Sequence, residues 1–286
     1  ANIFARLREQ SGAWFSLVLI IIPLSFLFIV ALGGVSHNRK WQISRVDIIG
    51  ANTVSSDKVR ALAGEKLLGS YFFVYARDNS YLFPKKEIEQ SILGTFPRIA
   101  SVSVEREDDH TIIISVSERK PYALWCGIDA GRRGVNVELA DCWFIDDAGF
   151  VFDRAPVFSE GVYLEVYAKL EEKNAGEPLR ATLPHSRFVA ANTFVKLLQR
   201  EIGEALRISL KPEGETEIIL RDSAKRPFLS GATIRFKDEE MPAVLVKNLL
   251  LAVPVQFPGN LALKKKLLYV DMRFGNKIFF GFEQQQ

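Results

Sequence analysis

The chain has 286 residues, of which 48% are hydrophobic and 25% are charged. This composition is typical of globular domains and excludes a chain that is disordered along its whole length. The 37 basic and 34 acidic residues leave a formal charge of +3, so the net charge gives no reason to expect nucleic-acid binding. Two cysteines and three histidines leave little material for a disulfide-rich scaffold, a metal centre or a histidine-based active site, and we expect no cofactor.

An uncharged apolar segment extends from Trp14 to Val35. Roughly 20 helical residues cross the ~30 Å hydrocarbon layer of a bilayer, so this segment predicts a single transmembrane helix. Pro23 is acceptable there because a kinked membrane helix can satisfy the freed backbone groups. The alternatives are a cleavable signal peptide, whose apolar part is usually ~7–15 residues long, and a buried core helix.

The positive charges on the two sides of this segment are nearly balanced. Arg6 and Arg8 precede it, and Arg39, Lys40 and Arg45 follow it. Counted alone, these charges slightly favour a cytoplasmic C-terminal part, but long C-terminal domains are translocated largely regardless of charge. We therefore expect residues 1–40 to be a cytoplasmic tail and the membrane helix, with the remainder of the chain outside the cytoplasm.

Residues 41–120 predict a βααββ domain. The expected elements are a strand at 43–49, a helix that begins at Ser55–Asp57 and stops at Gly64, an apolar link at 67–75, a helix from Pro84 to Gly94, and strands at 99–106 and 111–118. The last two strands alternate apolar and polar side chains, which is typical of a hairpin with one buried and one exposed face. Such a unit can bury one sheet face under two helices.

Residues 121–286 predict a mostly antiparallel β domain with two helices, so the fold class of the chain is α+β. The expected elements are a strand–turn–strand at 143–152, a helix at 188–202, strands at 206–210, 217–221 and 232–236, a helix at 244–253 broken by Pro254, and closing strands within 268–282. The charged segment 167–187 is expected to be a long linker.

Three motifs occur in a specific order along the folded part of the chain. They are Val46-Asp-Ile-Ile-Gly-Ala-Asn52, Phe96-Pro-Arg-Ile99 with Val102 and Val104, and Val116-Ser-Glu-Arg-Lys-Pro-Tyr-Ala-Leu-Trp125. In this order they resemble a POTRA domain and its exit in the FtsQ/DivIB family of bacterial cell-division proteins. A single membrane helix before one POTRA domain is that family's layout, and the segment 268–282 resembles its closing strands. The linker at 167–187 does not align.

The resemblance implies a bitopic scaffold of the division machinery, in the cytoplasmic membrane at the division septum. Its partners would be small coiled-coil membrane proteins, FtsB-like or DivIC-like and FtsL-like, together with other division proteins that bind the POTRA domain. It implies no catalytic residues, no nucleic acid and no small-molecule substrate.

The closing segment carries apolar residues at every second position. Phe274, Asn276, Ile278, Phe280 and Phe282 would share one face of an extended strand, and Phe279 would lie on the other face. Such a strand either fills the core of its own domain or offers an open sheet edge to a partner strand. Because the resembling family binds its coiled-coil partner through the last strands, we assign partner binding to these five positions.

Cys126 and Cys142 flank a charged loop. If residues 122–126 and 142–145 pair as a hairpin, the two thiols lie on facing strands, and a disulfide could persist outside the cytoplasm. Two separate, half-buried thiols are the alternative, and the interpretation that we favour.

No catalytic constellation is visible. His37, His110 and His185 are expected at the surface, and no Ser, Cys or Asp has a base at a recognisable spacing. Two other functions remain as alternatives. An outer-membrane assembly or secretion protein with POTRA domains would need a transmembrane barrel, for which the remaining chain is too short and too helical. A membrane-tethered cell-wall enzyme would need the missing catalytic groups.

Overall fold

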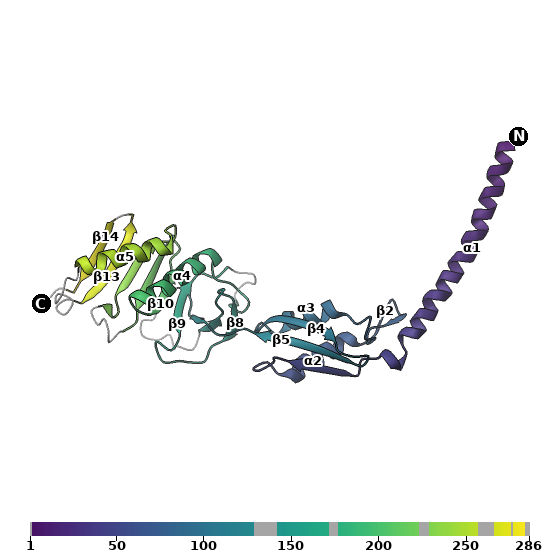
Figure 1. Cartoon of the computed structure of the whole chain (residues 1–286), viewed down its shortest axis with the longest axis horizontal. Coiled ribbons are helices and arrows are strands. Elements are labelled where there is room, and N and C mark those ends of the chain that lie inside the picture. Colours follow the sequence, from purple (N-terminus) through teal and green to yellow (C-terminus); the bar gives the residue numbers. More distant parts are fainter. Residues whose placement is uncertain are drawn as a thin grey trace. The chain divides into compact units, whose positions relative to one another are not determined.

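The computed structural model describes residues 2–128, 142–171, 177–222, 229–256, 266–275 and 277–283, with side chains from residue 19 onward. The chain forms two compact units, Ala1–Glu118 and Arg119–Gln286 (Figure 1). Within the described residues the fold is a mixture of helices and sheets, as the α+β prediction requires.

The first unit begins with a long helix and continues as a small α/β fold. Its elements are α1 (Asn2–Ser36), the 3-10 turn η1 (Arg39–Trp41), β1 (Arg45–Ile49), α2 (Ser56–Leu67), β2 (Ser70–Tyr71), β3 (Tyr75–Ala76), α3 (Lys85–Thr95), β4 (Ile99–Arg106) and β5 (Thr111–Glu118). Within α1, the segment Leu19–Ser36 is long and apolar enough to span a membrane.

The sheet of the first unit has the order β1-β5-β4, with β1 parallel and β4 antiparallel to the central strand β5. One face of this sheet packs against α2 and α3, and the shared core includes Val59, Ile88, Ile92, Val104 and Ile114. The bounds of β4 and β5 are those expected from the alternation of apolar and polar residues. The predicted βααββ order is therefore confirmed for these residues.

Two details of the first unit differ from the sequence-based expectation. Helix α2 does not stop at Gly64 but continues to Leu67, because Val59, Ala63 and Leu67 form one buried stripe. Burial of this last turn offsets the ~1 kcal/mol by which a helical glycine is less favourable than alanine. The expected apolar link instead contains the short antiparallel hairpin β2–β3.

The second unit is built on one large sheet. Its strands are β6 (Ala123–Trp125), β7 (Trp143–Ile145), β8 (Val151–Arg154), β9 (Leu164–Ala168), β10 (Ala205–Leu210), β11 (Glu215–Leu220), β12 (Thr233–Lys237), β13 (Leu267–Phe274) and β14 (Lys277–Phe282). The described strands are ordered β14-β13-β12-β11-β10-β9-β6-β7-β8, and most neighbouring pairs are antiparallel.

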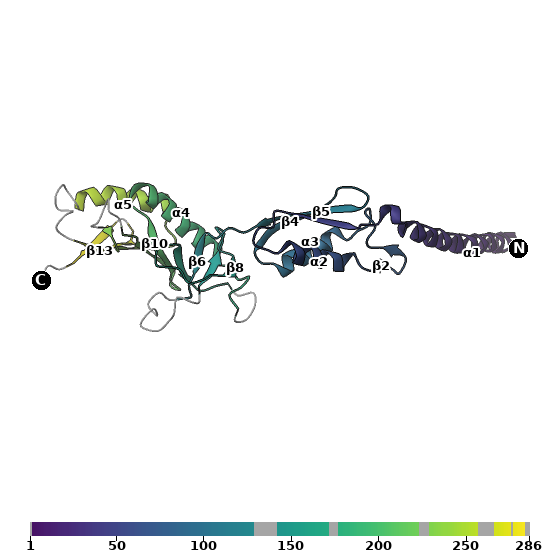
Figure 2. The same cartoon turned by 90° about the horizontal axis from the view of Figure 1, so that it is seen from below.

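Two helices, α4 (His185–Glu201) and α5 (Pro242–Gln256), lie along one face of this sheet (Figure 2). The core between them and the strands includes Phe188, Phe194, Ile208, Leu249 and Val270. Helix α5 is not broken at Pro254, contrary to expectation. Within the described residues, Val255 and Gln256 of the helix follow this proline, so few of the described backbone hydrogen bonds depend on the continuation.

The expectation of a long linker at 167–187 is wrong at both of its ends. Strand β9 (Leu164–Ala168) lies inside the sheet and pairs in parallel with β6 and β10, and α4 begins at His185. Residues 165–168 are buried on both faces. A strand that is buried on both faces shows no alternation of apolar and polar residues, so the sequence pattern did not reveal it.

Candidate partner-binding edge

Strand β14 is the terminal strand of the large sheet. It pairs with β13 in an antiparallel hairpin, and no other strand in the described part of the chain pairs with it. The chain reverses direction after Phe274, and Gly275 has a φ of +65°, a conformation that glycine adopts without steric cost. The outer side of β14 is therefore an open sheet edge among the described strands, of the kind that can accept a strand from a partner.

One cross-strand row of apolar side chains faces the helices. The register places Ile218, Ile234, Val270 and Phe280 next to one another on β11, β12, β13 and β14. The first three are buried, whereas Phe280 on the edge strand is only half-buried. Ile278, Phe280 and Phe282 pack against the core from the edge of the sheet. An added strand would cover the part of this row that is still exposed to solvent.

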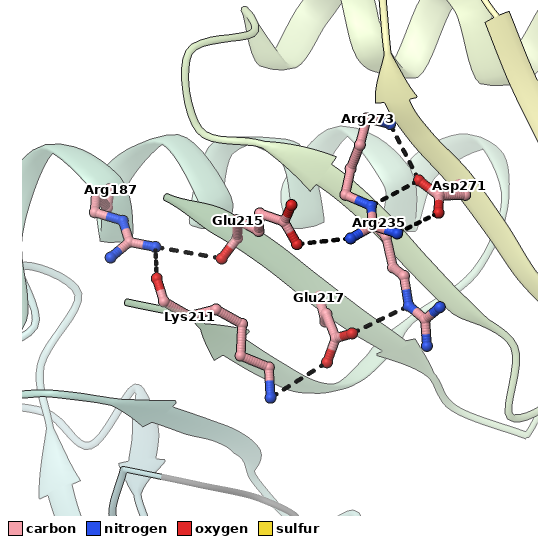
Figure 3. A network of polar contacts seen from close by, with 7 residues as sticks. All are labelled: Arg187, Lys211, Glu215, Glu217, Arg235, Asp271 and Arg273. Atoms are coloured by element: carbon pink, nitrogen blue, oxygen red, sulfur yellow. Dashed lines mark hydrogen bonds and ion pairs between the residues drawn. The ribbon is translucent and has the colours of Figure 1, made fainter. Parts of the chain in front are cut away.

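The neighbouring cross-strand row lies on the opposite face of the sheet. Its residues on β11, β12 and β13 are charged, and its residue on the edge strand β14 is aromatic. Its members are Glu217, Arg235, Asp271 and Phe279, again on β11 to β14. Nε of Arg235 lies 3.0 Å from a carboxylate oxygen of Glu217, and Nζ of Lys211 lies 3.5 Å from the other (Figure 3). Phe279, at the end of this row, is 50% exposed.

Asp271 and Arg273 form a bidentate contact on this face of the sheet. The guanidinium of Arg273 donates from Nε to Oδ1 of Asp271 over 2.9 Å and from Nη2 to Oδ2 over 2.6 Å, and its Nη1 donates to Glu215 over 2.7 Å (Figure 3). The side-chain hydrogen bonds from Arg273 hold the pKa of the buried Asp271 below its usual value. The two carboxylates in turn raise the pKa of Arg273. The pair is thus charged at neutral pH.

Arg187 at the start of α4 connects the helix layer to the same region. Its Nη2 donates to the backbone carbonyl of Lys211 over 2.6 Å and to that of Glu215 over 3.3 Å (Figure 3). Its Nε also forms an ion pair with Asp238. These contacts fix the turn between β10 and β11, and so they position Glu215 for its contact with Arg273.

Aromatic side chains cover the end of the charged face, next to the open edge. The rings of Phe274 and Phe279 meet edge to face, with centroids 5.3 Å apart. Tyr269 lies across from Gly281, and the guanidinium of Arg235 lies 5.4 Å from the centroid of its ring. We call Tyr269, Phe274 and Phe279 the aromatic patch.

The predicted site residues fall into three groups. Ile278, Phe280 and Phe282 pack against the core. Phe274 does not belong with them, because the chain turns after it and its ring contacts Phe279. Asn276 lies outside the described residues.

Sequence reasoning placed Phe279 on the other face of the strand, but it counted neither Phe279 nor Tyr269 as a site residue, because it assigned partner binding to one face of 274–282 alone. The Gly-Asn pair at 275–276 is a turn signal that could have divided the segment into two strands.

The opposite end of the sheet is closed by its own chain. At β8, the backbone N–H of Val151 donates to the carbonyl of Ala181, and its carbonyl accepts from the N–H of Arg180. Backbone groups of this edge strand are therefore paired with the segment that precedes α4. This pairing distinguishes β8 from β14, which among the described strands pairs with β13 alone.

Cys126 and Cys142 are joined by a disulfide, so the interpretation as two separate thiols is wrong. The antiparallel pairing of β6 with β7 brings the two cysteines together, because Trp125 lies opposite Trp143 one residue further in. In the chain-entropy model, a cross-link of this length stabilises the fold by roughly 3 kcal/mol.

The three histidines lie at separate places on the surface. Nδ1 of His37 lies 2.9 Å from the carbonyl of Gly33, Nδ1 of His110 lies 3.0 Å from that of Gln42, and His185 begins α4. No group of three His, Cys, Asp or Glu residues that could hold a metal ion occurs in the part of the chain that the structure describes.

Comparisons with known proteins agree with the fold of the first unit. Residues 42–119 match the family model described as "POTRA domain, FtsQ-type". A search of curated proteins finds no match for the chain. Proteins with this type of POTRA domain are non-enzymatic division proteins that act through protein–protein interactions. Together with the apolar helix before it, the domain is consistent with a single-pass inner-membrane protein. The chain therefore carries an FtsQ-type POTRA domain, which supports its place in the FtsQ/DivIB family of bacterial cell-division proteins.

Proposed function

We propose that this protein is a bitopic scaffold of the bacterial division machinery, whose edge strand β14 accepts a strand from a small coiled-coil membrane partner. The partners are FtsB-like or DivIC-like and FtsL-like proteins, and the POTRA domain recruits further division proteins. The protein would be located at the septum and would couple septum assembly to cell-wall synthesis. It binds no nucleic acid or small-molecule substrate and carries out no chemical reaction.

The observation that supports this proposal best is that both cross-strand rows end on β14 at a phenylalanine that is still partly exposed to solvent. The apolar row through Val270 ends at the half-buried Phe280, and the charged row through Asp271 ends at the exposed Phe279. A partner strand would continue both rows, burying apolar side chains on each face while its backbone pairs with β14. Burial of apolar surface stabilises a complex by roughly 25 cal/mol per Å² before the cost of ordering is subtracted.

Helix α1 would strengthen binding of the partner to β14 without contacting the partner itself. A partner that is also anchored by one helix moves in the same two-dimensional layer, so its effective concentration near β14 is high. A moderate strand-to-edge affinity is then enough for stable capture in the cell.

The experiment is a pull-down from cells that produce the full chain, comparing the wild type with Phe279→Asp and Val162→Asp. Phe279 is 50% exposed and Val162 is 57% exposed, so neither substitution places a charge in the core. Val162 lies just before β9, away from the open edge. We expect Phe279→Asp to lose a small coiled-coil membrane partner and Val162→Asp to retain it.

A third variant separates partner binding from core packing. Phe280 packs against the core, so Phe280→Asp should lose the partner and also lower the thermal stability of the second unit. Retention of the partner by a folded, membrane-bound Phe279→Asp variant would contradict the assignment of β14 as the binding edge.

A further inference from the structure

The hairpin β2–β3 in the first unit ends in two exposed aromatic side chains. Phe72 is 88% exposed and Phe73 is fully exposed. Both residues have positive φ angles, 50° and 62°, which bulky residues rarely adopt. Leu68, immediately before the hairpin, is 73% exposed. Exposed apolar side chains that lie together on a protein surface usually mark a site that contacts a membrane or another protein. The tip of this hairpin is such a site.

The hairpin packs directly against the C-terminal end of α1. Gly33 is buried, and a Cβ at this position would lie 2.3 Å from Cγ1 of Val74. The buried hydroxyl of Ser36 accepts the backbone N–H of Ala76 over 3.1 Å, and the carbonyl of Ser36 accepts Nδ2 of Asn79 over 2.9 Å. Gly33 and Ser36 belong to the segment Leu19–Ser36 that is apolar enough to span a membrane.

These contacts also fix the direction in which the hairpin points. Ala76 at its base contacts Ser36, whereas Val74, nearer the tip, contacts Gly33, one helical turn back along α1. The hairpin tip at 72–73 therefore points back along the apolar segment and away from the sheet of the POTRA domain. Figure 1 shows this hairpin beside the end of α1.

Two further features match the boundary layer of a bilayer. A groove of ≈ 380 Å³ lies between the end of α1 and the segment that contains β3, and its lining includes Leu32, Val35, Tyr75 and Leu82. Arg39 and Lys40 follow α1 and are exposed. Segments that lie in the boundary layer of a bilayer bury Phe and Leu side chains below the headgroups and keep Lys and Arg on their polar side.

We propose that the tip of the β2–β3 hairpin inserts into the membrane, with Phe72 and Phe73 in the interfacial layer of the leaflet on the side of the POTRA domain. The hairpin and α1 then form a two-point anchor that limits rotation of the POTRA domain about the helix. The lipid bilayer is the occupant because the helix segment that the hairpin contacts is itself the membrane-spanning segment. The inference rests on α1 being a membrane helix.

The test is the depth of a nitroxide label in the full chain, reconstituted in vesicles of phosphatidylcholine and phosphatidylglycerol. The native cysteines are joined to each other, so an introduced cysteine can be labelled selectively. The label positions are Phe73→Cys at the tip, Lys58→Cys at the far end of α2 as the aqueous control, and Leu27→Cys in α1 as the bilayer control. Phe72→Cys provides a second tip position in case Phe73→Cys fails to fold.

We expect the label at 73 to collide with oxygen and to lose collisions with a water-soluble nickel chelate, whereas the label at 58 behaves in the opposite way. A label at 73 as open to the nickel chelate as the label at 58 would overturn the proposal. Shielding of residue 73 from both reagents would overturn it in favour of a protein partner or a second copy of the chain. A water-exposed label at 27 would overturn it together with the membrane span, while leaving the edge-strand proposal for β14 standing.

Discussion

The ring of Tyr269 on β13 occupies the space above Gly281 on β14. A Cβ built on Gly281 would lie 2.1 Å from Cε1 of Tyr269, and two other ring atoms would lie within 2.6 Å of it. Contact between an aromatic ring and a cross-strand glycine compensates for the missing side chain on an edge strand. The same ring lies beneath the guanidinium of Arg235, so it links the edge strand to the charged face of the sheet.

Gly281→Ala should displace Tyr269 and so remove its contact with Arg235. We expect a loss of about 1 kcal/mol of stability, the usual size of a partly exposed cation–π contact, and weaker capture of the partner strand. Gly203→Ala is the matched control, because a Cβ there meets nothing within 4 Å. Equal thermal stability and equal partner capture in the two variants would show that the ring does not support the edge.

Asp271→Asn should destabilise the second unit at neutral pH by about 2–3 kcal/mol. The substitution removes the bidentate partner of Arg273, whose charge then keeps Glu215 as its carboxylate partner among the described residues. Hydrogen bonds from Arg273 make the pKa of Asp271 lower in the folded state than in the unfolded state, where it is about 3.9. The ionised Asp271 therefore stabilises the fold at pH values above about 3.9, and this stabilisation is lost as the pH falls through the lower pKa of the folded state.

Urea unfolding of the full chain at several pH values measures this effect, with the exposed Asp222→Asn as the control. The stability difference between the wild type and Asp271→Asn should shrink below about pH 4, since the wild-type carboxylate is then protonated. A difference that stays constant down to pH 2 would contradict the ionic role of Asp271.

Glu118 at the end of β5 should be an acid-sensitive point of the POTRA domain. Its Oε1 accepts the backbone N–H groups of Asn52, Thr53 and Val54 over 2.8, 2.8 and 2.9 Å. Burial raises the pKa of this carboxylate, but the three backbone hydrogen bonds outweigh burial and hold it below its usual value. The ionised Glu118 therefore contributes its full stabilisation of the POTRA domain above about pH 5, and this contribution is lost as the pH falls through the lowered pKa.

Hydrogen exchange of the amides of residues 52–54 in the full chain tests this role. Glu118→Gln keeps one acceptor oxygen but loses the charge, so these amides should lose protection at pH 7, by a factor of about 10. The exposed Glu107→Gln should leave them unchanged. If the protection at residues 52–54 is the same in Glu118→Gln and the wild type, the carboxylate does not hold this loop.

Gly33 and Gly34 in α1 form a matched pair of positions. A side chain on Gly33 meets Val74 of the β2–β3 hairpin, whereas one on Gly34 meets nothing within 4 Å. Gly33→Ala should therefore push the hairpin from the helix and make a label at residue 73 more mobile in its electron paramagnetic resonance spectrum. Gly34→Ala should have no effect on that spectrum. Equal spectra for the two variants would mean that the hairpin is not packed on α1.

Much of the POTRA fold could be predicted because its strands have one buried and one exposed face. Ser101, Val102, Ser103 and Val104 alternate along β4, and Ile112, Ile114 and Val116 mark the buried face of β5. The short hairpin β2–β3 could not be predicted in this way. Its strands are two residues long, too short for any periodicity, and its aromatic tip looks like a core segment.

The position of the closing strands was predicted, but the faces of their side chains were not. Residues 267–282 supply the terminal strands of the sheet, as the apolar pattern indicates. The face of each side chain depends on a turn at Gly275 and on a register shift between Asp271 and Phe274. Each of these features changes which residues share a face, so counting every second residue from Phe274 assigned Phe274 to the wrong group.

The central claim, that β14 receives a partner strand, is tested most directly by photo-cross-linking from position 279 in living cells. A benzoylphenylalanine in place of Phe279 lies at the open edge, and the same residue in place of Val162 serves as the control. We predict a light-dependent adduct between residue 279 and one small coiled-coil membrane protein, and no such adduct from residue 162. A full-length, membrane-bound protein that forms no adduct from residue 279, or the same adduct from both positions, would contradict the claim.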